Sequence, residues 1–158
     1  MKQRRGFTLV ELLVVISIIG FLTVASVVVF NIVRMQARDA VRVGNIATLT
    51  RALAMYLNDS KTGYPASTGE CLKASEKVGK ELKDKQVLLT VPTDPLWPET
   101  PPGSIGVGVN DKGLAIGASE KFCYYYFSEF NNQYKISFYL ESNSKSGNAG
   151  INSTVVNN

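Results

Sequence analysis

The sequence predicts an α+β fold in which one long N-terminal helix packs against a small antiparallel β-sheet. Two observations carry this prediction. No proline interrupts the chain between Met1 and Tyr64, and proline is the residue that most strongly breaks a helix interior. After a proline-rich stretch come four short runs of β-branched and aromatic residues, joined by Asn, Asp and Gly, as in an antiparallel meander.

The first half of the predicted helix is apolar on all sides. Between Glu11 and Arg34 lie 22 residues without a formal charge, which is long enough to cross a hydrocarbon core of about 30 Å. Residues 7–33 are therefore expected to span a membrane once. The basic residues of the leader, 1–6, precede this span and favour a cytoplasmic N-terminus with an extracytoplasmic head.

The second half of the helix, 34–58, is amphipathic. Val43, Ile46, Leu49, Leu53 and Leu57 recur at spacings of three and four, which is one face of a helix. This face is expected to lie under a soluble head, within one continuous helix from about 7 to 57. Four polar residues are expected largely off that face: Arg38, Arg42, Asn45 and Arg51.

The head is predicted in three parts. Residues 59–104 form an irregular, proline-rich connection with a short charged helix inside 72–89 and a loop packed by Leu96 and Trp97. Residues 105–140 form the sheet, and 141–158 form a polar, flexible tail because Gly, Asn and Ser dominate there. The strands expected in or beside the sheet region are Ser104–Val109, Leu114–Ala118, Phe122–Phe127 and Tyr134–Leu140.

Composition argues against an enzyme. The chain has no histidine and two cysteines, which excludes Ser-His-Asp and Cys-His catalysis and any structural zinc site. No metal and no cofactor are predicted. Calcium bound by Asp94, Asp111, Glu120 and Glu129 is disfavoured because the dense acidic loop of such sites is missing.

The formal charge of +4 is mostly a property of the leader. Without Lys2, Arg4 and Arg5 the 17 basic residues fall to 14, against 13 acidic ones. The charge therefore gives no argument for a nucleic-acid partner.

Cys71 and Cys123 form either one disulfide or two buried thiols. An extracytoplasmic head favours the disulfide.

Glu11 is unusual because an ionised carboxylate is costly inside a bilayer. A position at headgroup depth would make its cost small, as in a plain signal anchor. A secretory signal cut after Thr23-Val24-Ala25 fits less well, because its apolar region would be shorter and would lack an acid.

Residues Gly6 to Glu11, GFTLVE, resemble the class III signal of the type IV pilin and type II secretion pseudopilin family. That signal is a short basic leader ending in Gly, followed by Phe and by a Glu five places after the cut. The resemblance implies that prepilin peptidase cleaves between Gly6 and Phe7 and methylates the new amine of Phe7. The Tyr64-Pro65 pair that follows the predicted helix also resembles this family.

The resemblance implies a structural subunit of a type IV pilus or a pilus-like secretion or competence filament. Paired with the Phe7 amine of a neighbouring copy, Glu11 would fix the register of packed helices. An assembly ATPase and a membrane platform protein are implied as partners. The subunit would wait in the inner membrane and end in a cell-surface or periplasmic filament. The alternative is a membrane-anchored receptor or adhesin that does not polymerise.

Overall fold

The computed structural model describes residues 7–60, 62–102, 108–109, 115–116, 119, 121–129 and 131–157. The leader 1–6 with Gly6, most of the predicted strands Ser104–Val109 and Leu114–Ala118, and Asp111 and Glu120 lie outside these residues. The chain divides into two compact units, Met1–Ala37 and Arg38–Asn158.

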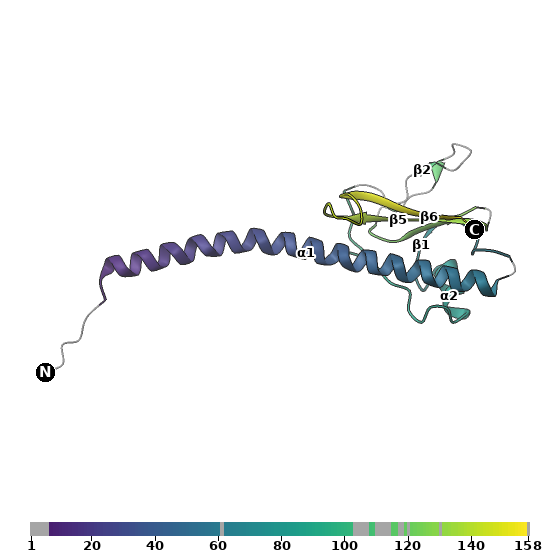
Figure 1. Cartoon of the computed structure of the whole chain (residues 1–158), viewed down its shortest axis with the longest axis horizontal. Coiled ribbons are helices and arrows are strands. Elements are labelled where there is room, and N and C mark those ends of the chain that lie inside the picture. The colour runs from purple at the N-terminus through teal and green to yellow at the C-terminus, as the bar shows by residue number, and fades with distance from the viewer. Residues whose placement is uncertain are drawn as a thin grey trace. The chain divides into compact units, whose positions relative to one another are not determined.

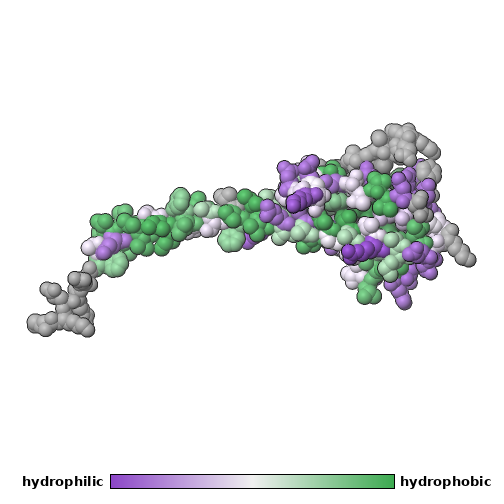
Figure 2. Space-filling view, in the orientation of Figure 1, coloured by the Kyte–Doolittle hydropathy of each residue, from purple (hydrophilic) through white to green (hydrophobic). Residues whose placement is uncertain are grey.

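Helix α1 spans Leu9–Asp59, close to the predicted bounds, because no proline interrupts it. In the first unit, every described side chain from Phe7 to Arg34 is exposed, and Figure 2 shows that apolar groups make up this surface. Among the described residues, α1 is the one helix long and apolar enough to cross a membrane, by length and composition.

The second unit holds a four-stranded antiparallel sheet in the order β1-β4-β5-β6, a separate two-stranded sheet of β2 and β3, and a short helix, α2 (Figure 1). Helix α2, Lys77–Asp84, lies inside the segment where a short charged helix was predicted. The strands are β1 Ser67–Cys71, β2 Gly108–Val109, β3 Ala115–Ile116, β4 Tyr125–Ser128, β5 Gln133–Leu140 and β6 Gly150–Asn157.

The core of this unit lies between the second half of α1 and one face of the sheet. Leu49 and Leu53 of α1 and Ile136 of β5 are all fully buried there. Removing such side chains from water stabilises the fold by roughly 1.5–3 kcal/mol each. The predicted fold class, a long N-terminal helix with a small antiparallel sheet, is confirmed.

Two details of the prediction are wrong. The flexible tail expected over 141–158 contains β6, which pairs with β5 along its whole length. The reason is that four of its eight residues, Ile151, Thr154, Val155 and Val156, are β-branched and favour a strand. The single meander is also wrong, because β2 and β3 form a two-stranded sheet of their own and β1 adds to β4 instead. Strand β1 arises in the supposedly irregular region 59–104, where a disulfide holds its last residue, Cys71.

Candidate functional site

The first candidate site is the start of α1, where Thr8 and Glu11 form a capping box. The Thr8 backbone N–H and hydroxyl donate to Glu11 Oε2 at 2.8 and 2.7 Å, and the Glu11 N–H donates to Thr8 Oγ1 at 3.2 Å. Each residue thus satisfies an N–H of the other that the helix itself leaves unpaired. Glu11 has a structural role in the single chain that the sequence reasoning missed, although Thr-x-x-Glu is the known signature.

Both capping bonds of the Glu11 side chain end on Oε2. Among the described residues no hydrogen bond reaches Oε1. Phe7, directly before the N-cap Thr8, is 79% exposed. The carboxylate can therefore hold the helix start through one oxygen and accept a further donor through the other.

Behind this cap, the apolar half of α1 exposes a continuous surface of large aliphatic and aromatic side chains. A surface of this size is not stable in water. It must be covered by lipid or by other protein.

The second unit carries a further surface on α1, the outer helix face, which points away from its core. Ordinary surface helices place charged residues on that side. Here Arg51 is the one charged residue among eight exposed positions, and the face is otherwise built from small or apolar groups. Its residues are Ala40, Val41, Gly44, Ala47, Thr48, Arg51, Ala54 and Met55.

A buried ion cluster lies at the first residues of the second unit. Arg42 is fully buried; its Nε and Nη2 donate to Asp94 at 2.8 and 3.1 Å, and its Nη1 donates to Asp39 at 2.8 Å and to Glu141 at 2.6 Å. Arg38 also donates to both oxygens of Glu141, at 2.7 and 2.5 Å. The cluster joins α1, the proline-rich loop and the end of β5.

Hydrogen bonds set the charge states of this cluster. Burial alone would raise the pKa of Asp39, but donors from the backbone of Glu141 and from Ser142 hold it below its ordinary value. The hydrogen bond from Arg38 lowers the pKa of Glu141. Burial lowers the pKa of Arg42, yet its bonds to Asp94 and Glu141 outweigh that effect and raise it. Asp39, Glu141 and Arg42 therefore stay ionised near neutral pH.

The two cysteines are joined. Cys71, at the end of β1, and Cys123, before β4, form a disulfide with a Cα–Cα distance of 5.7 Å. Leu96 and Trp97 of the proline-rich loop pack against a hydrophobic cluster that consists of Phe122, Cys123 and Tyr125. The bridge thus links the connecting region to the sheet.

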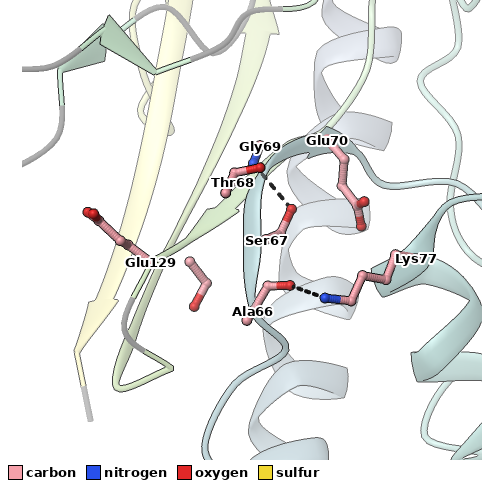
Figure 3. Close-up of a pocket in the computed structure, with 8 residues that line it drawn as sticks. Ala66, Ser67, Thr68, Gly69, Glu70, Lys77 and Glu129 are labelled. Atoms are coloured by element: carbon pink, nitrogen blue, oxygen red, sulfur yellow. Dashed lines mark hydrogen bonds between the residues drawn. The ribbon is translucent and has the colours of Figure 1, made fainter.

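A pocket of about 290 Å³ lies beside β1 (Figure 3). Its two charged groups on the α2 side are already engaged, since Lys77 Nζ donates to the Ala66 carbonyl at 2.9 Å and Glu70 accepts from the Val78 N–H at 2.6 Å. The residues lining it include no histidine or cysteine, and they form no nucleophile–base pair. The pocket is lined by Ala66, Ser67, Thr68, Gly69, Glu70, Lys77, Ser128 and Glu129.

Comparisons with known proteins point to the first site. Residues 1–27 match the family described as the prokaryotic N-terminal methylation motif. Over 94 residues the chain is 34% identical to the type IV major fimbrial protein FimA of Dichelobacter nodosus, which covers 58% of this chain and 54% of that protein. The chain thus spans about half the length of this relative. No solved structure matches. The similarity to type IV pilins predicted from the sequence is confirmed.

Proposed function

We propose that this type IV pilin-like chain is the structural subunit of a filament built from many copies of itself. One observation carries the proposal most directly: the methylation motif is followed immediately by a helix half whose apolar surface is wholly exposed. A bilayer covers that surface before assembly, and the same surfaces of neighbouring copies cover it afterwards.

Processing prepares the helix for this exchange. Cleavage between Gly6 and Phe7, followed by methylation, leaves a cationic secondary amine on Phe7. The amine of one copy pairs with Glu11 of the next, because both charges are costly among apolar helices unless they meet. The open Oε1 of Glu11 receives this donor while Oε2 keeps the bond to Thr8. An axial step of the wrong size would leave both charges unpaired, so the pair selects the register.

The outer helix face favours polymerisation over a receptor or adhesin that stays single. A head that remained alone in water would gain nothing from exposing Val41, Ala47 and Met55 on one side of α1. In a filament this face lies against neighbouring copies, where small side chains allow close approach.

The cellular setting follows from these steps. The subunit lies in the inner membrane with its head outside the cytoplasm until prepilin peptidase, an assembly ATPase and a membrane platform protein act on it. The similarity to a major fimbrial protein favours a cell-surface pilus over a secretion pseudopilus. The chain itself acts by assembly and catalyses no reaction.

Electron microscopy of cells with and without the gene, with the head immunolabelled, tests the proposal, and N-terminal sequencing of filament material tests the processing step. Labelled filaments beginning at Phe7 are expected. Membrane labelling without filaments would favour the single anchored receptor.

Four variants separate the two roles of Glu11. Glu11→Gln keeps a capping side chain but removes the charge, and Thr8→Val removes the cap but keeps the charge. If pairing with the Phe7 amine drives assembly, Glu11→Gln is processed but forms few filaments, while Thr8→Val assembles better than Glu11→Gln. Thr8→Ser is the matched control for the cap, and Glu11→Ala removes both functions. If Thr8→Val formed fewer filaments than Glu11→Gln, the effect of Glu11 on assembly would be due to capping alone.

A further inference from the structure

The two edges of the sheet are protected to different degrees. Strand β1 is short, its register with β4 shifts between Ser67 and Glu70, and Gly69 within it has a φ of 120°. Lys77 reaches the carbonyl of Ala66 just before the strand. Short length, a bulge and a nearby lysine are the devices by which proteins prevent another strand from adding to an edge.

Strand β6 lacks these devices. Its eight residues pair with β5 in unbroken register, and they include no proline and no charged residue. Ile151 and Val155 are 45% and 57% exposed. The Asn152 amide donates to the Gly150 carbonyl at the strand start. Within the described residues, the backbone of Ile151–Asn157 hydrogen-bonds to no strand other than β5.

We propose that β6 is a self-recognition edge, at which the β6 strand of a second copy adds antiparallel about Ser153. In that register Ser153 lies opposite its own equivalent, and Ile151 lies opposite Val155 of the second copy. Residues two apart share a face of a strand, so these three residues stay on the exposed face in both copies. Cross-strand pairs of β-branched residues are among those that stabilise sheets.

The absence of charge on β6, together with the self-pairing register about Ser153, favours a second copy as the partner. A neutral strand gives no electrostatic advantage to a charged peptide, whereas pairing with itself brings no like charges together. The nearest charged side chain on the exposed face is Lys135, which lies beside Val155 on β5. Beyond Lys135 and Val155, the next residues across the pair are Ile151 and Tyr139 of the second copy. The Lys135 side chains of the two copies therefore lie on opposite sides of the two-fold axis. The exposed face of β6 consists of Ile151, Ser153 and Val155. In the pair, Ile151 of each copy therefore lies against Val155 of the other.

A two-fold pair is closed and cannot repeat along one polar filament. The contact therefore joins copies that do not follow one another in a filament, and it does not depend on the proposed function.

Cysteine cross-linking of the full chain in detergent tests this contact. Both native cysteines are bonded to each other, so Ser153→Cys adds the unpaired thiol. Opposed residues in antiparallel strands have Cα atoms about 4.5–5.5 Å apart, which is within disulfide reach. Mild oxidation is expected to give a covalent dimer as the main product. Ser146→Cys, in an exposed turn, and Thr68→Cys, on the β1 edge, should stay largely monomeric.

A second substitution tests whether the edge itself makes the contact. Val155→Lys in the Ser153→Cys chain should reduce the dimer to the level of Ser146→Cys, because it places a charged side chain opposite the apolar Ile151 of the second copy. Equal cross-linking of Ser146→Cys, or no dimer from Ser153→Cys with a protease-resistant head, would overturn the proposal. If Ser153→Cys does not fold, the unmodified chain should still sediment as a larger species than Val155→Lys, and equal sizes would count against the contact.

Discussion

Arg42 and Asp94 are both fully buried and are joined by two hydrogen bonds, although 52 residues separate them in the sequence. Each charge is held away from water by the fold and neutralised by the other. This pair fixes the proline-rich loop against α1 and provides the most specific stability test in the head.

Arg42→Met should destabilise the head strongly, by about 3–5 kcal/mol, because it leaves buried carboxylates without their counter-ion. Urea titration of the full chain in detergent, followed by protease resistance of the head, measures this change. Arg51→Met is the matched control, since Arg51 is exposed and forms no ion pair among the described residues. A similar loss in both variants would show that the cluster has no special role.

Acid should loosen the same cluster. The folded pKa values of Asp39 and Glu141 lie below their ordinary values of 3.8 and 4.5, so the stability that these groups provide is complete above that range. It is lost as pH falls through the lower, folded pKa values. Protease resistance measured between pH 7 and pH 2 should therefore fall below about pH 4. The head of the Asp39→Asn variant should be less stable than the parent at neutral pH, and its protease resistance should fall less between pH 7 and pH 2.

Loss of the disulfide should weaken the head without abolishing the fold of its core. The chain-entropy model gives about 3–4 kcal/mol for a cross-link across this span. The double variant Cys71→Ser/Cys123→Ser should therefore unfold at a lower urea concentration than the oxidised parent. The reduced parent should match the double variant, and no difference between oxidised and reduced parent would contradict the prediction.

A charge on the outer helix face should block assembly while leaving the head folded. Ala47→Glu adds a carboxylate that neighbouring copies would have to bury, whereas the single head leaves it in water. The expected result is normal protein in the membrane fraction and few filaments in electron micrographs. Ala74→Glu makes the same change at an exposed alanine outside this face and should assemble normally. Normal filaments from both variants would show that this face stays exposed.

Local patterns predicted the parts of the fold that depend on local chemistry. The absence of proline and the spacing of Leu49 and Leu53 were enough for α1, and alternation was enough for most of β5. The two edge strands of the sheet, β1 and β6, were not predicted. The tail was predicted to be flexible from its Gly, Asn and Ser content, although the β-branched residues Thr154, Val155 and Val156 favour a strand.

The sequence prediction of a site is confined to a short motif, and the cleavage at Gly6 and the pairing of Glu11 stay predictions. Gly6, Phe7 and Glu11 follow from exact spacing, and the fold of the head has no part in it. Arg42 was predicted to lie largely off the apolar face, and this is wrong. It is fully buried on the same helix face as Ile46 and Leu49, because carboxylates far away in the sequence neutralise it there. Nothing local to Asp94 or Glu141 indicates that both meet one guanidinium, because that meeting is produced by packing.

The ion cluster begins at Arg38, the first residue of the second unit, and it ties α1 to two other segments of the head. A pull on the helix from its N-terminal side would therefore act on these ion pairs where the second unit begins. The charged groups anchor α1 to the proline-rich loop and to the end of β5. An axial pull on the helix would load bidentate guanidinium–carboxylate bonds, whose directions are fixed by the planar fork of the guanidinium.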